Sequence, residues 1–292
     1  MAWAKRLRFP AEVVAVVLVA SACSVSNPVV GPSTPGASAR GSNAGSPAPR
    51  NSSHPPGSTS RAAPGQTNGG ALASGYADDA AVGAMARTYL RGSPATSLTV
   101  EVDWVSGRDP SGTALDHLSA ILRRELDKPG GIRVALGNRI ASGRSTWSLE
   151  DLVSLEKANR SGHSGGGRAT MWICYVNGSF AENANALAVA FSASSAAIFR
   201  DRIDDATTSL VLEPEIERSV IVHEVGHLLA LVNIGYRSRY DHEDPQHPHH
   251  SNNPDSVMYW AVEDVSVRNI LRGGPPDDFD DADRADLAML RG

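Results

Sequence analysis

Residues 220–232 read VIVHEVGHLLALV, an apolar run that is interrupted by His223, Glu224 and His227. On a helix, residues four apart project from the same face one turn apart, so the two imidazoles can bind one metal ion. The glutamate beside the first histidine can polarise a water molecule at that metal. The alternative is two core histidines that happen to lie four residues apart. The apolar surroundings favour the metal, because buried polar groups require partners and one zinc ion supplies a partner for both imidazoles.

The motif lies inside a longer helix, which we expect over residues 214–232. Pro214 suits the first helical position, and Glu215 and Glu217 are favourable at the positive end of the helix dipole. Elsewhere, alternating or periodic apolar side chains predict further strands and helices. The expected strands are 98–104, 132–136, 170–176 and 186–191, and the expected helices are 113–126, 148–158 and 277–290.

The N-terminus has the pattern of a secretory signal peptide over residues 1–22. Residues 3–9 are basic, and residues 11–22 are nearly all small or aliphatic, in a run too short to span a bilayer comfortably. The run ends in ASAC at 20–23, which resembles a bacterial lipobox. The resemblance implies that Cys23 is lipidated and that the chain is exported and anchored to the outer face of the membrane in the cell envelope. Ordinary cleavage at this site would instead release a secreted protein.

A tether and a single domain follow the signal peptide. Residues 23–75 are mostly Ser, Gly, Pro, Ala, Thr and Asn, and cannot bury enough apolar surface to offset chain entropy. Residues 76–292 remain as one domain of ordinary size, which we expect to be monomeric. This domain carries a net charge near −10, which argues against a nucleic-acid partner because phosphate binding needs clustered Lys and Arg.

Cysteine usage is sparse. Cys174 is the only cysteine besides Cys23, so lipidation of Cys23 leaves no partner for an intramolecular disulfide. Cys174 lies in MWICYV at 171–176, which is apolar on both faces as a central strand would be. We expect a buried core thiol rather than a catalytic one, because nothing electropositive surrounds it in the sequence.

A second motif lies downstream of the helix, where residues 255–259 read DSVMY. Together with HEVGH at 223–227, this segment resembles the metzincin metallopeptidases, in the matrixin-like form of their Met-turn. The resemblance implies a metzincin-like α+β fold: a twisted mixed β-sheet with packed helices, an active-site helix and a small C-terminal subdomain. It also implies that Met258 forms an apolar floor under the metal without binding it.

The sequence departs from the metzincin pattern at the third metal ligand. The pattern HExxHxxGxxH requires glycine and histidine at the places of Ala230 and Asn233. Alanine in place of glycine predicts that the helix runs on, with Gly235 as its C-cap. The neutral amide of asparagine is a poor zinc ligand, so the usual third position is vacant.

The loop 236–255 contains histidines that can fill this vacancy. His250 is the expected third ligand, because it lies eight residues before Met258, which is the matrixin-like distance from third histidine to Met-turn methionine. His247 and His242 are the alternatives. A solvated loop rich in His, Asp and Pro, with surface metal affinity only, is the other interpretation of this composition.

The sequence therefore predicts a zinc-dependent endopeptidase with one catalytic Zn²⁺ ion, bound by His223, His227 and His250. Glu224 is the expected general base, which takes a proton from water and passes it to the leaving amine. The expected partners are a peptide or protein substrate and, through the lipid anchor, a membrane. The alternative is a catalytically inactive zinc-binding or scaffolding envelope lipoprotein, consistent with the departures from the metzincin pattern.

Overall fold

The computed structural model describes residues 75–208, 211–264 and 274–292. The signal peptide predicted at 1–22, the lipidation site Cys23 and the tether up to residue 74 lie outside the described residues. Within the part of the chain that is described, no helix has both the length and the apolar character needed to cross a membrane.

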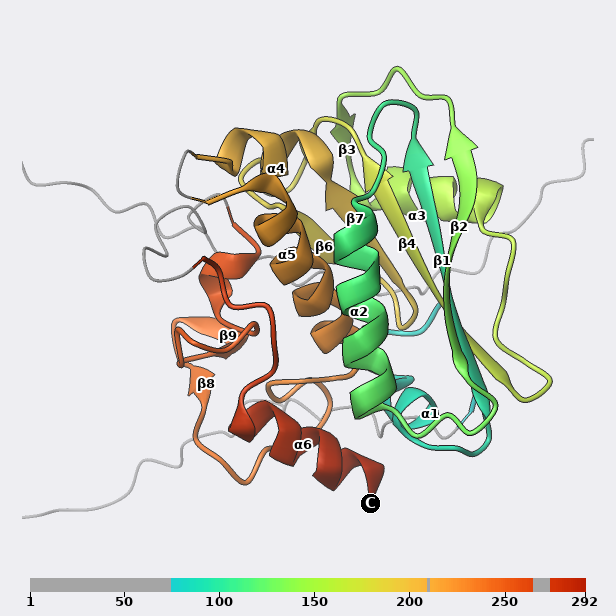
Figure 1. Cartoon of the computed structure of the whole chain (residues 1–292), viewed down its shortest axis with the longest axis vertical. Helices are drawn as coiled ribbons and strands as arrows, with labels where there is room; N and C mark the ends of the chain where they lie inside the picture. The colour runs from blue at the N-terminus through green and yellow to red at the C-terminus, as the bar shows by residue number, and fades with distance from the viewer. Residues whose placement is uncertain (1–74, 209–210, 265–273) are drawn as a thin grey trace, which may run out of the picture. The chain divides into compact units, whose positions relative to one another are not determined.

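A five-stranded mixed sheet forms the centre of the fold, in the spatial order β2-β1-β4-β7-β6 (Figure 1). Neighbours among β1, β2, β4 and β7 pair in parallel, whereas β6 pairs antiparallel with β7 at the sheet edge. The strands are β1 (Ser97–Val105), β2 (Ile132–Ile140), β4 (Arg168–Val176), β6 (Ala188–Ala190) and β7 (Ser195–Phe199). A mixed sheet with packed helices is the fold class that was expected.

The central strand β4 is buried along nearly its whole length. A strand with neighbours on both sides and helices on both faces is apolar in both directions, as MWICYV at 171–176 is. Cys174 in this strand is free and buried, and burial raises the pKa of its thiol well above the usual value. The prediction of a buried core thiol is confirmed.

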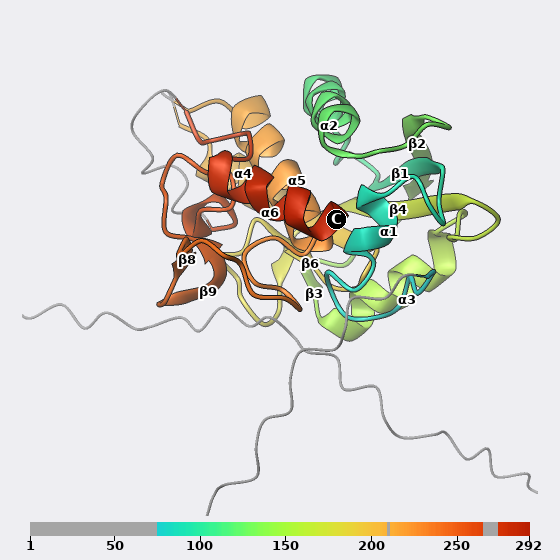
Figure 2. The same cartoon turned by 90° about the horizontal axis from the view of Figure 1, so that it is seen from below.

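Helices cover both faces of the sheet. Helices α2 (Gly112–Glu125) and α5 (Glu213–Leu228) pack against each other on one face, and α3 (Leu149–Asn159) lies on the other (Figure 2). Separate apolar clusters fill the two interfaces. The remaining elements are α1 (Ala86–Leu90), α4 (Arg200–Ala206), α6 (Asp281–Arg291), the 3₁₀ turn η1 (Trp260–Val262), and the ladders β3 (Thr146–Trp147) with β5 (Ser179–Phe180) and β8 (Glu243–Asp244) with β9 (His247–Ser251).

The expected strands and helices are present, and the elements that were not expected include β7 and α4. The sequence FSASSAAIF at 191–199 is dominated by Ser and Ala, so it lacks the bulky aliphatic pattern that indicates a strand. Its small side chains are nevertheless buried, because β7 lies between β4 and β6. A capping box begins α3, since the Ser148 hydroxyl accepts a hydrogen bond from the Asp151 amide and the Asp151 carboxylate accepts one from the Ser148 amide.

The predicted extent of α5 is wrong at its C-terminal end. The helix ends at Leu228 rather than running on to Gly235. Ala230 adopts a φ of 66°, its amide bonds to the His227 carbonyl, and the Leu231 amide bonds to the Gly226 carbonyl. These two bonds are the Schellman ending, which usually places glycine where Ala230 stands. The left-handed conformation costs alanine roughly 1–2 kcal/mol, and burial of Ala230 holds it there.

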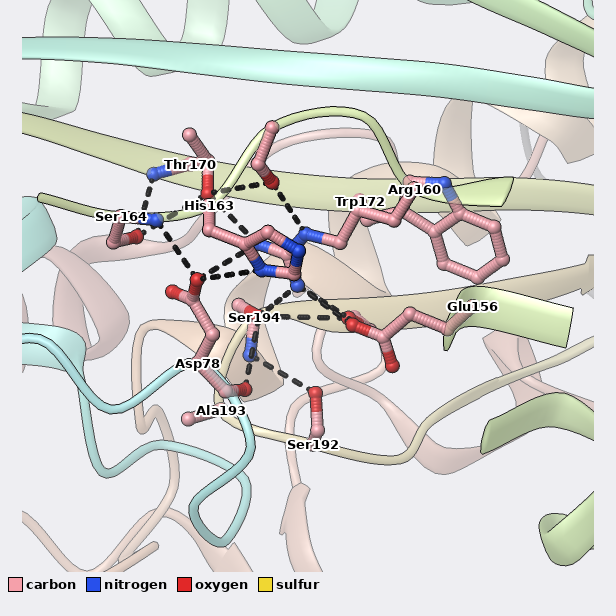
Figure 3. A network of polar contacts seen from close by, with 12 residues as sticks. Asp78, Glu156, Arg160, His163, Ser164, Thr170, Trp172, Ser192, Ala193 and Ser194 are labelled. Carbon is pink, nitrogen blue, oxygen red and sulfur yellow. Dashed lines mark hydrogen bonds and ion pairs between the residues drawn. The ribbon is translucent and has the colours of Figure 1, made fainter. Parts of the chain in front are cut away.

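A buried arginine joins the end of α3 to the sheet (Figure 3). The Arg160 side chain is 1% exposed and forms an ion pair with Glu156 at 2.6 Å. Its guanidinium also donates to the Thr170 hydroxyl on β4 and to the Ser194 hydroxyl before β7, each at 2.7 Å. Asp78, from the first described segment, lies 3.3 Å from the same group. Four separate parts of the chain therefore depend on one buried cation.

Arg160→Met should lower the free energy of unfolding by about 3–5 kcal/mol, because it leaves buried acceptors without their cation. Urea denaturation followed by circular dichroism measures the change. The matched control is Arg202→Met, whose more exposed ion pair with Asp205 should be worth no more than about 1 kcal/mol. Equal effects of the two substitutions would contradict the role given to Arg160.

Candidate metal centre

Two of the predicted site residues project from the same face of α5. His223 and His227 are one helical turn apart, and their exposed fractions are 0% and 3%. Their Nε2 atoms lie 3.0 Å apart, and their ring centroids lie 4.6 Å apart. The i, i+4 spacing therefore brings two imidazole nitrogens to one point inside the protein.

A third imidazole reaches this point from β9. The ring centroid of His250 lies 5.2 Å from that of His223 and 5.1 Å from that of His227, and the side chain is buried. The following residue, Ser251, donates its amide to the carbonyl of Met258 at 2.7 Å. This bond ties β9 to the segment 255–259, which lies beside the helix, and so places His250 next to the two helical histidines.

A carboxylate that the sequence analysis missed completes the cluster. Glu263, just after η1, lies 3.5 Å from His223 Nε2, 3.8 Å from His227 Nε2 and 3.2 Å from His250 Nε2. One ligand atom from each of the four side chains lies within 4.8 Å of all the others. No motif or fixed spacing surrounds Glu263, so only the three-dimensional structure identifies it.

Hydrogen bonds on the far side of two rings orient their nitrogens. His223 Nδ1 is 2.6 Å from the Val257 carbonyl, and His250 Nδ1 is 3.0 Å from the Pro248 carbonyl. Each Nδ1 therefore carries the proton, and in the neutral ring the Nε2 lone pair faces the cluster. A backbone carbonyl behind a ligating histidine is the usual outer partner of a metal ligand.

The pKa values of the clustered imidazoles and of Glu263 also bear on whether the cluster can bind a cation. Burial lowers the pKa of His227 to about 3, so this imidazole is neutral and able to ligate. Burial by itself raises the pKa of the Glu263 carboxyl, but the three histidines, led by His250, hold it well below its usual value. Burial lowers the pKa of His250, but Glu263 raises it above the usual value, so a metal ion bound at this ring would displace its proton. Three imidazoles and a carboxylate are donors that Zn²⁺ prefers. The donor set of the described residues therefore fits zinc.

Glu224 is the most isolated polar side chain of the site. It is fully buried, and neither carboxylate oxygen has a hydrogen-bond partner among the described residues. Burial raises the pKa of Glu224 well above its usual value, and the charge of Glu263 raises it further, while the backbone of Ala190 in β6 opposes the rise. A buried carboxyl with a perturbed pKa beside possible metal ligands marks a functional site.

Met258 lies against the helix between the two histidines. It is fully buried, and a Cβ added at Gly226 would overlap its sulfur and crowd the ring of Phe279. The glycine inside HEVGH is therefore required by the close approach of the Met-turn, rather than by its own backbone conformation. That Met258 forms a floor under a metal stays a prediction.

The other histidines of the loop 236–255 lie outside the cluster. His242 Nε2 is 2.9 Å from an oxygen of Asp286 in α6, and the same ring faces Asp283. The ring of His247 stacks on Trp260 at 4.3 Å, and His249 Nδ1 lies 3.2 Å from the Val232 carbonyl. Of the three candidates for third ligand, the structure thus brings His250 alone to His223 and His227.

Asn233, at the vacant ligand position, organises the loop instead. Its amide nitrogen donates to Glu243 at 2.6 Å, and its amide oxygen accepts the Ser238 amide at 2.6 Å. Glu243 in turn accepts the amide of His249 at 2.8 Å. The residue that replaces the usual ligand therefore shapes the hairpin that carries His250.

Comparisons with known proteins give distant structural likenesses only. No family model matches the chain, and no curated protein matches it. Archaemetzincin from Methanopyrus kandleri is 11% identical with a TM-score of 0.44, covering 68% of this chain and 97% of that one. Metalloproteinase-II from Bacteroides fragilis is 11% identical with a TM-score of 0.41, and the match covers 70% of this chain and 56% of that one. At this distance neither likeness bears on the chemistry of the site.

Gly226→Ala should lower the free energy of unfolding by about 1–3 kcal/mol, because the added methyl group overpacks the contact with Met258. The matched control is Gly112→Ala in α2, where an added Cβ meets nothing within 4 Å. Gly112 is the first residue of α2, so alanine there meets no steric conflict and this control should be neutral or slightly stabilising. Thermal unfolding of both variants checks the prediction, and stabilisation by Gly226→Ala would refute the contact.

Proposed function

We propose that the chain is a zinc-dependent endopeptidase in which His223, His227 and His250 hold one zinc ion. The observation that carries the proposal is the convergence of three buried imidazoles beside Glu224, a buried carboxyl group without a hydrogen-bond partner among the described residues. A structural role for these side chains would leave unexplained why so many polar groups are buried together, since each costs free energy unless it is paired.

When bound by His223, His227 and His250, zinc would act as a Lewis acid that polarises a peptide carbonyl and acidifies water at the site. The carbonyls of Val257 and Pro248 keep the imidazoles of His223 and His250 in the orientation that binding requires.

Glu224 is the proposed general base and acid. Its carboxylate accepts a proton from the attacking water as the water oxygen bonds to the carbonyl carbon of the substrate. The same proton is then given to the leaving nitrogen as the C–N bond breaks, so Glu224 ends as it began. Burial raises the pKa of Glu224 above its usual value, which makes its carboxylate a stronger proton acceptor than an exposed one.

The sheet edge offers a place for an extended substrate. β6 is the edge strand, and its residue Ala190 faces Glu224. An extended peptide can add to an exposed sheet edge through main-chain hydrogen bonds, which requires no particular side chain. Peptide or protein chains in an unfolded, extended form are therefore the substrate class that we propose.

One observation favours the second candidate, a zinc-binding protein without catalysis. Glu263 offers a fourth donor to the three histidines. Structural zinc sites are closed by four protein ligands, whereas catalytic sites keep one position open. Whether Glu263 binds the metal permanently therefore decides between the endopeptidase and the zinc-binding protein without catalysis.

His250→Ala should abolish or greatly weaken zinc binding, because it removes one of three nitrogen donors. Elemental analysis after dialysis against a weak chelator should find one zinc per wild-type chain and less than one in the variant. His247→Ala, in the same strand but stacked on Trp260, is the matched control and should keep its zinc. Zinc retained in His250→Ala and lost in His247→Ala would assign the third ligand to His247.

Glu224→Ala should keep its zinc and lose turnover by a factor of about 10²–10⁴ or more, the range in which general acid–base groups contribute. Hydrolysis of an unfolded protein such as reduced casein gives the rate, and elemental analysis gives the metal content of the same sample. A variant that retains wild-type turnover would show that Glu224 is not the general base.

A further inference from the structure

We propose that Glu263 is a fourth ligand of the same metal. In this closed state the segment of Glu263 holds the carboxylate at the metal, and the segment must move away before a substrate can bind. This inference rests on the proposed function, because it needs a metal at the three histidines. It adds a ligand and a form of regulation that the HEVGH motif and the Met-turn do not indicate.

The position of the carboxylate is that of a ligand. Atoms that share a tetrahedral zinc ion, with bonds of about 2.0–2.1 Å, lie roughly 3.3 Å from one another. The oxygens of Glu263 are between 3.2 and 3.8 Å from the Nε2 atoms of the three histidines. The carboxylate forms its ion pairs, within the described part of the chain, with these imidazoles, and no Lys or Arg competes for it.

The backbone of the same segment is attached to the sheet beside the edge strand. The Leu187 amide donates to the Glu263 carbonyl at 2.7 Å, and Ala186 forms an antiparallel bridge with Asp264. Residues 186–187 lead directly into β6, the strand whose Ala190 faces Glu224. An extended peptide that followed β6 to its beginning would meet the segment of Glu263. Closure of the Glu263 segment would therefore block the fourth coordination position of the metal and the start of the β6 edge at the same time.

The neighbourhood of Glu263 favours a reversible contact over a permanent one. Glu224 is a buried carboxyl close enough to the partly exposed Glu263 to feel its charge, and it has no hydrogen-bond partner among the described residues. A site built only to hold zinc gains nothing from this second carboxyl, since burying it without a partner costs free energy. Release of Glu263 frees a coordination position and removes the repulsion between the two carboxylates.

The test uses the full chain loaded with Co²⁺, whose visible absorption reports the ligands around the metal. Acetohydroxamate serves as the probe of an open coordination position. In Glu263→Gln the absorption spectrum should change, and acetohydroxamate should bind about tenfold more tightly than to the wild type. Tenfold corresponds to a wild-type chain that is open about one-tenth of the time, because the apparent Kd is divided by the open fraction.

Glu150→Gln is the matched control, since Glu150 is exposed on α3 at the opposite face of the sheet. It should reproduce the wild-type spectrum and affinity. Glu263→Ala provides a second variant if Glu263→Gln fails to give the wild-type circular dichroism spectrum. Casein hydrolysis by the opened variants should rise in parallel with acetohydroxamate affinity.

The outcomes separate this inference from the proposed function. One Co²⁺ per chain, with identical spectra and acetohydroxamate affinities in wild type and Glu263→Gln, overturns the role of Glu263 and leaves the three-histidine site standing. Loss of the metal from a correctly folded Glu263→Gln would make Glu263 a permanent ligand and overturn reversible closure. Absence of stoichiometric metal from the wild type overturns both.

Discussion

The burial of charged and polar groups at one point is the constraint on which this structure depends. Three imidazoles and two carboxyls meet at the face of α5, in surroundings that are otherwise apolar. Among the described residues, neither oxygen of Glu224 has a hydrogen-bond partner, and the ion pairs of His223, His227 and His250 are with Glu263. A divalent ion bound at this point would satisfy the donors together, and the stability of this region and the proposed chemistry would then have the same origin.

Segments that are distant in the sequence together form this cluster of side chains. The helix supplies two donors, the β9 hairpin supplies the third, and the Met-turn links them through the bond from Ser251 to Met258. Gly226 lets the Met-turn approach the helix, and Asn233 shapes the loop that leads to the hairpin. The clustered side chains are thus held by backbone pairing and close packing rather than by their spacing along the chain.

Local patterns predicted most of the fold, because they depend on neighbours in sequence. The alternation in β1, the stripe of α2 and the capping box of α3 all have such local causes. The end of α5 was missed because burial holds Ala230 in a left-handed conformation that alanine disfavours. Strand β7 was missed because its small side chains show no alternation of bulky apolar and polar residues. Glu263 could not be predicted, since its partners lie 13 to 40 residues away and no local pattern marks it.

Because His250 lies on a hairpin, a site of this kind does not require its third histidine at a fixed distance from the HEVGH motif. In a chain that uses HExxHxxGxxH, the third donor is bound to the helix by a fixed count of residues. Here the count is replaced by an anchor at each end, Asn233 on one side and the Ser251–Met258 bond on the other. The length of chain between these anchors is therefore free to change in evolution without moving the donor. Proteins built in this way would share the geometry of the site without a common spacing between the helical histidines and the third histidine. A sequence motif of fixed length would not detect them.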